Sequence, residues 1–139
     1  QSGGASGTTT AGLAFGGNTG YPGTISVNKT YEYASPTWTA SNNMNTPRAV
    51  GGPTMAGSQT ATVFMGGNNR PGGATTATEE YNGTCWTTTT ALPAARENSA
   101  GTGTSTAGLV SGGNAPSQTN TALEFNGAGT PETRTITTS

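Results

Sequence analysis

Short apolar runs that end in Gly-Gly-Asn recur three times along this chain, and polar stretches rich in Thr and Gly separate them. From Gly16 to Gly66 is 50 residues, and from Gly66 to Gly112 is 46. Self-similarity at a period of roughly 20–50 residues indicates a repeat architecture. The six glycines of the motif are Gly16 and Gly17, Gly66 and Gly67, and Gly112 and Gly113.

Each repeat continues with the same order of strand-like segments and turns. After a variable loop comes a short segment that ends in a glutamate and an aromatic residue, and the aromatic position is held by Tyr33, Tyr81 and Phe125. A turn follows. Two of the three turns contain Asn-Gly, which predicts a type I′ hairpin whose two central residues both have positive φ. Two repeats then place a tryptophan, Trp38 or Trp86, in the next strand.

Four short strands therefore make up each repeat, and no segment of helical length places apolar residues at i, i+3, i+4 and i+7. Four strands in a unit of roughly 40–50 residues is the pattern of a propeller blade. We expect one all-β domain over residues 1–139, with three four-stranded antiparallel blades at about 1–46, 47–94 and 95–139. Closed propellers have roughly 4–8 blades, so we expect closure by oligomerisation or by further chain.

Three arrangements would complete such an assembly. Two chains combine into one ring, the chain is a piece of a longer polypeptide that supplies more blades, or three sheets pack in a trimeric or prism-like assembly. The chain begins just after the place where the repeat would put an arginine, which fits a fragment or a processed product and equally a chain defined by repeat phase. Each arrangement predicts that this chain is not a stable monomer.

The composition narrows the classes of function. Charged residues make up 8% of the chain, and the five basic residues are far apart, so the clustered Lys and Arg of a nucleic-acid surface are missing. No stretch approaches the roughly 18 apolar residues of a membrane helix, and we expect no membrane insertion. The sequence has no histidine, no aspartate and a single cysteine, which argues against the commonest general base and the usual metal ligands. We expect a non-enzymatic protein with no cofactor and no metal.

The recurring small and aromatic residues have a structural interpretation and a functional alternative. The Gly-Gly pairs are expected to end the second strand of each blade, because glycine tolerates positive φ and close backbone approach. A phosphate cradle would need a helix N-terminus or a P-loop pattern. The aromatic residues of the repeat and both tryptophans are expected to pack between adjacent sheets, with sugar stacking as the alternative. Cys85 is expected to be a small buried hydrophobe.

A glutamate precedes the aromatic residue in all three repeats. These carboxylates are expected to tie neighbouring units together through the repeated arginines or through backbone N–H groups. A ring of carboxylates around a central channel is the alternative. The residues concerned are Glu32, Glu80 and Glu124, with Arg48 and Arg96.

The loops after Gly-Gly-Asn differ in length and sequence among the repeats. Binding residues are disproportionately found on variable loops carried by a constant scaffold. The candidate ligand contacts on these loops are Tyr21, Asn68, Asn69, Arg70 and Asn114.

Gly-Gly at a strand end, a later aromatic residue and a later tryptophan resemble the kelch pattern of β-propellers. The stretches TAGLAFGG, TATEEYNG, WTTTTALPAAR and TRTITTS resemble the kelch-like repeats of virion structural proteins in marine bacteriophages, cyanophages among them. This resemblance implies a tail-fibre, spike or head-decoration component on the virion surface, partnered by copies of itself or by other virion proteins. The alternative is a carbohydrate or host-receptor binding module on the same scaffold, with a host-surface glycan as its ligand. Copper chemistry of the galactose-oxidase kind would need histidine ligands.

Overall fold

The computed structural model describes residues 3–20, 25–49, 55–114, 116–127 and 132–135. In these residues the regular structure is β, arranged as three four-stranded antiparallel sheets and one short hairpin. The first sheet consists of β1 (Gly4–Gly7), β2 (Ala11–Phe15), β3 (Thr30–Ala34) and β4 (Thr37–Ser41). The second consists of β5 (Met55–Ser58), β6 (Ala61–Met65), β9 (Thr78–Tyr81) and β10 (Trp86–Thr88). The third consists of β11 (Ala100–Gly103), β12 (Gly108–Ser111), β13 (Thr121–Phe125) and β14 (Glu132–Thr135).

Each sheet is a simple meander in which every strand pairs with its neighbour in sequence. The second sheet carries one insertion between β6 and β9, the hairpin of β7 (Asn68–Asn69) and β8 (Gly73–Ala74). The expectation of an all-β, antiparallel chain is therefore confirmed.

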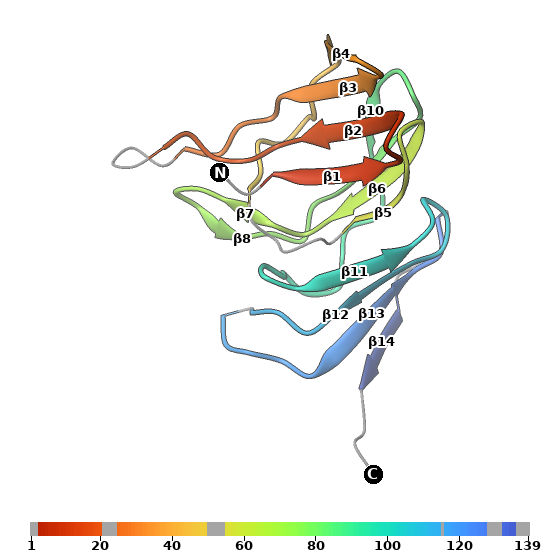
Figure 1. Ribbon diagram of the computed structural model, residues 1–139. Helices are drawn as coiled ribbons and strands as arrows, with labels where there is room; N and C mark the ends of the chain where they lie inside the picture. The colour runs from red at the N-terminus through yellow and green to blue at the C-terminus, as the bar shows by residue number, and fades with distance from the viewer. Residues whose placement is uncertain (1–2, 21–24, 50–54, 115, 128–131, 136–139) are drawn as a thin grey trace.

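The first strands of the three sheets lie side by side. Strand β5 contacts β1 on one side and β11 on the other. In Figure 1 the sheets spread from this row, with β4 of the first sheet at the top and β14 of the third sheet at the bottom. The second sheet thus lies between the other two, and neighbouring sheets pack face to face.

The core of the molecule is divided between two junctions, one on each face of the second sheet. Side chains alternate along a strand, so β6 sends Phe64 toward the first sheet and Val63 and Met65 toward the third. The first junction contains Leu13, Phe15, Met44, Phe64, Tyr81 and Trp86. The second junction contains Val63, Met65, Leu92, Val110, Leu123 and Phe125.

The Gly-Gly pairs end the second strand of each sheet, as predicted, and all six glycines have positive φ. Gly66 shows why a side chain is excluded there. A Cβ on Gly66 would lie 2.6 Å from the carbonyl oxygen of Arg96, and the next amide, Gly67 N, donates to that oxygen at 2.7 Å. The glycines therefore let the end of one unit bond directly to the start of the next.

The prediction of type I′ turns at Asn-Gly is wrong. Gly83 has a φ of 88°, but Asn82 is not among the residues with positive φ. The Asn82 side chain instead accepts hydrogen bonds from the amides of Thr84 at 3.0 Å and Cys85 at 2.9 Å. An asparagine that bonds its own following backbone stabilises a longer turn, and β9 and β10 are joined by four residues.

Candidate functional sites: buried ties and open sheet faces

A buried arginine holds the first junction together. The Arg48 side chain is fully buried, and its Nη2 lies 2.9 Å from Glu79 Oε1. Its Nη1 donates to the carbonyl oxygens of Gly66 at 2.7 Å and Ala77 at 2.6 Å. The guanidinium carbon lies 4.2 Å from the centroid of the Phe64 ring. One cation thus connects the end of β6 to the start of β9 in the second sheet.

Glu79 extends this tie to the segment that links the first and second sheets. Its two carboxylate oxygens accept hydrogen bonds from the amides of Asn45 at 2.7 Å and Thr46 at 3.1 Å. Burial lowers the pKa of Arg48 to about 10, and the neighbouring Glu79 carboxylate opposes that shift. At neutral pH Arg48 therefore stays charged and Glu79 is its counter-ion.

The glutamate that the repeat places at the expected tie position is Glu80, but the carboxylate that pairs with Arg48 is Glu79. Glu79 lies opposite Phe64 and Glu80 opposite Val63, so the two carboxylates point to opposite faces of β9. Only Glu79 faces the junction that contains Arg48. Adjacent side chains of a strand point to opposite faces. Once the face of β9 that turns toward the first sheet is known, this alternation identifies Glu79 as the partner of Arg48.

The second arginine of the repeat, Arg96, is not paired with a carboxylate among the residues that the structure describes. Arg96 Nη2 donates to Thr121 Oγ1 at 2.7 Å and its Nη1 to the carbonyl of Ala95 at 3.0 Å. The place that corresponds to Glu79 in the third sheet is held by Leu123. Glu124 lies opposite Leu109 on the other face, so a Glu–Arg tie does not recur in every repeat.

Glu32 makes a different contact across the first junction. It accepts hydrogen bonds from the Tyr81 hydroxyl and, at 2.9 Å, from Ser41 Oγ. Beside it, Trp86 Nε1 donates to Thr30 Oγ1 at 3.0 Å. The two polar tips of the Tyr81 and Trp86 rings are thus both satisfied by the first sheet.

Replacing Tyr81 with Phe tests this contact, and we expect a loss of about 1 kcal/mol in the free energy of unfolding. Burial, and to a smaller extent the bond to Glu32, raises the pKa of the Tyr81 hydroxyl above its usual 10.0. A raised pKa in the folded state gives stability that is present below pH 10 and is lost as the pH rises through the folded value. The difference between Tyr81→Phe and the parent should therefore shrink above pH 10, as measured by urea unfolding at several pH values. Tyr31→Phe, at a position exposed in the single chain, is the control when both variants are measured in dilute protein, and an equal effect of both changes would contradict the assignment.

The Tyr–Trp pair of the second sheet has a counterpart in the first sheet with the same geometry. The ring centroids of Tyr81 and Trp86 are 5.1 Å apart at 40°, and those of Tyr33 and Trp38 are 5.0 Å apart at 42°. Their environments differ, because Trp86 is 5% exposed and Trp38 is 55% exposed. The prediction that Tyr33 and Trp38 pack between sheets is therefore wrong within this chain, since no described sheet covers that face.

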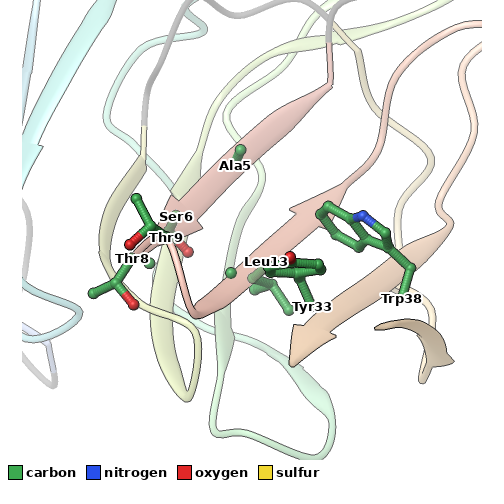
Figure 2. Close-up of a pocket in the computed structure, with 9 residues that line it drawn as sticks. Ala5, Ser6, Thr8, Thr9, Leu13, Tyr33 and Trp38 are labelled. Carbon is green, nitrogen blue, oxygen red and sulfur yellow. The ribbon is translucent and has the colours of Figure 1, made fainter. Parts of the chain in front are cut away.

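A shallow hollow lies over this exposed face. It has a volume of about 410 Å³ and is lined by residues of β1 to β4, including Ala5, Gly12, Tyr33 and Trp38. Figure 2 shows Tyr33 and Trp38 side by side on neighbouring strands at one end of it, with Thr8 and Thr9 at the other. Tyr33 and Trp38 in its lining lie on the face of the first sheet opposite to Leu13, which packs in the first junction.

The third sheet also has a face turned away from the second sheet. Leu109 on this face is 36% exposed. A hollow of about 350 Å³ is lined there by Thr102, Leu109 and Glu124 among others. Both ends of the three-sheet stack are therefore open and partly apolar.

The candidate residues of the variable loops do not converge on one site. Tyr21 lies outside the described residues. Asn68 is 7% exposed, donates to Glu97 and forms a backbone bridge with Ala49. Asn114 forms a backbone bridge with the same Glu97. These two asparagines therefore belong to the framework in the structure.

Asn69 and Arg70 are exposed at the tip of the inserted hairpin. A hollow of about 300 Å³ beside them is lined by Asn68, Arg70, Pro71 and Gly73. Cys85 is exposed as well, so the prediction of a buried cysteine is wrong. The Cys85 amide donates to the Asn82 side chain in the turn after β9. Cys85 thus belongs to this turn, outside the core.

Within the described ranges, no group of three or more His, Cys, Asp or Glu side chains is placed to hold a metal ion. In the same part of the chain there is no helix long and apolar enough to cross a membrane. A scan against protein-family models found no match to this chain, and a search among curated proteins found none either.

Proposed function

We propose that this chain is a non-enzymatic structural protein of a virion, a tail-fibre, spike or head-decoration component built from kelch-like repeats in which each four-stranded sheet is one blade. One observation carries the proposal. The Tyr–Trp pair that seals the first junction recurs with the same geometry on the open face of the first sheet. An exposed surface with the same Tyr–Trp pair as a buried junction indicates that a further sheet packs on it. This supports a structural role in an assembly.

The placement of the basic residues supports an extracellular particle. Trypsin-like proteases need an accessible Lys or Arg in a segment that can open locally. Arg48 and Arg96 are buried, and Arg70 precedes a proline, which blocks cleavage after it. Among the described side chains, Lys29 is then the exposed basic residue that remains. Such a surface suits a protein exposed to digestive proteases.

A carbohydrate or host-receptor binding role is the second candidate, and one observation favours it. Asn68 Oδ1 is buried and has no hydrogen-bond partner in the described part of the chain. It belongs to the hollow of about 300 Å³ that Arg70 also lines. A buried acceptor beside an exposed guanidinium is the kind of polar contact that fixes a sugar hydroxyl.

Mass spectrometry of gradient-purified virus particles tests the first proposal. We expect the tryptic peptides 30–48 and 97–134 at the abundance of a major particle protein. Finding the chain only in the soluble fraction of infected cells would contradict a virion role. On a glycan array, binding by the parent chain that is lost in Arg70→Ala and kept in Asn69→Ala would favour the second candidate instead.

A further inference from the structure

We propose that the open face of the first sheet docks onto the open face of the third sheet of a second copy, so that two copies close one ring. The first-sheet open face is defined by Gly12, Ala14, Tyr31, Tyr33 and Trp38. The third-sheet open face is defined by Thr102, Leu109, Ser111 and Glu124. The inference rests on the proposed function, in which each four-stranded sheet is one blade. It adds that the partner of the open faces is a second copy of this chain.

The first-sheet open face has the Tyr–Trp pair and the strand register of a junction half. Tyr33 lies between Gly12 and Trp38 across β2, β3 and β4. In the second sheet, Tyr81 lies in the same way between Thr62 and Trp86. That second-sheet surface is buried against the first sheet through Trp86, Tyr81 and Phe64. The first sheet therefore presents the surface that elsewhere in this chain receives the preceding sheet.

The third-sheet open face carries a leucine and a glutamate at two positions of the opposite half, Leu109 and Glu124. Leu109 occupies the repeat position of Leu13 and Val63. Leu13 is 1% exposed in the first junction and Val63 is 0% exposed in the second, whereas Leu109 is 36% exposed. Each copy of the chain thus holds both halves of a junction, one at either end of its stack.

The polar groups of the two faces also match. At the first junction the Tyr81 hydroxyl donates to Glu32. At the second junction Phe125 occupies the repeat position of Tyr81 and has no hydroxyl to offer Glu80. Between copies the corresponding residues are Tyr33 and Glu124. Docking in the same register brings the Tyr33 hydroxyl to the Glu124 carboxylate, so the bond of the first junction recurs.

The number of sheets favours a closed dimer. A contact between two different surfaces of identical chains is heterologous, and such contacts form a ring when the rotation closes. Two copies of three sheets give a number of sheets inside the range of roughly 4–8 blades seen in closed propellers, and three copies exceed it.

Size-exclusion chromatography with light scattering measures the predicted assembly. We expect the parent chain at twice its mass of 13.7 kDa. Trp38→Arg and Leu109→Arg should each elute at 13.7 kDa with an unchanged far-UV circular dichroism spectrum. Ile25→Arg is the matched control, because Ile25 is an apolar residue 60% exposed on a loop outside both faces, and it should stay dimeric.

Mixing the two variants tests the head-to-tail pairing. Trp38→Arg keeps an intact third-sheet face and Leu109→Arg keeps an intact first-sheet face. We therefore expect the mixture to form dimers of one copy of each through a single junction, with weaker affinity than the parent. If Leu109→Arg alone stays dimeric, the contact joins two first-sheet faces and the inference is wrong.

A folded monomeric parent, or a broad series of larger masses, would also overturn the closed dimer. A monomer would leave the proposed structural role standing, because a further repeat of a longer polypeptide covers the same two faces. If the chain forms the dimer but is missing from purified particles, the head-to-tail pairing is supported and the proposed virion role is contradicted.

Discussion

Replacing Glu79 with Gln should lower the free energy of unfolding by about 3 kcal/mol, because it leaves a buried guanidinium without its counter-ion. Arg48 and Glu79 are both fully buried. Gln keeps the shape of the side chain but only one of the two oxygens that accept the Asn45 and Thr46 amides. The loss therefore reports the missing charge and one missing acceptor, and not a cavity. A chain of this size has a total stability of only about 5–15 kcal/mol, so this is a large fraction.

Urea unfolding followed by circular dichroism, at one fixed protein concentration, measures the effect. Glu80→Gln is the matched control because it is the adjacent carboxylate on the opposite face of β9. It should change the stability by no more than about 0.5 kcal/mol. Equal effects of the two substitutions would show that the Arg48–Glu79 pair does not stabilise the junction.

The double substitution Arg48→Met with Glu79→Leu should recover most of the loss of Glu79→Gln. Replacing a buried ion pair by apolar residues of similar volume is often neutral or stabilising. The third sheet already holds Leu123 at the place of Glu79, which shows that the repeat accepts an apolar residue there. A double variant less stable than Glu79→Gln would mean that the Arg48 bonds to Gly66 and Ala77 matter more than the charge balance.

The sequence predicts the strand ends and the strand order well, although the type I′ conformation expected of the Asn-Gly turns is not found. The ends of the second strands follow from the Gly-Gly pairs, because positive φ at these positions is a property of the residue itself. The order of four antiparallel strands in each repeat follows from short apolar runs and the turn residues between them. Both features are present in the three sheets.

Features that depend on neighbouring sheets are not predicted from the repeat. Trp38 and Trp86 occupy the same repeat position, yet only Trp86 has a sheet in front of it. Glu79 and Glu80 are adjacent in sequence, and which of them meets Arg48 depends on which face of β9 turns toward the first sheet. Local sequence leaves these outcomes open because burial belongs to the assembled stack.

The aromatic residue at the centre of the first junction should have the largest effect of any single truncation, and Trp86→Ala is expected to cost about 3–5 kcal/mol of stability. The indole ring of Trp86 lies 4.9 Å from the Phe15 ring in an edge-on arrangement and 5.1 Å from the Tyr81 ring. Its truncation removes both ring contacts, opens a cavity and leaves Thr30 Oγ1 without its donor.

Trp38→Ala is the matched control for this change because it removes the same side chain from the same repeat position. Dilute protein, below the concentration at which copies associate, should lose no more than about 1 kcal/mol on this substitution, since Trp38 is 55% exposed. At higher concentration the stability of the parent should rise with concentration through mass action, and that rise should be missing in Trp38→Ala. Thermal and urea unfolding over a hundredfold range of protein concentration separates the stability of the single chain from the stability gained when copies associate. Equal losses for Trp86→Ala and Trp38→Ala at every concentration would mean that the open face of the first sheet is covered within a single chain. Both tryptophans would then be packed between sheets of that chain.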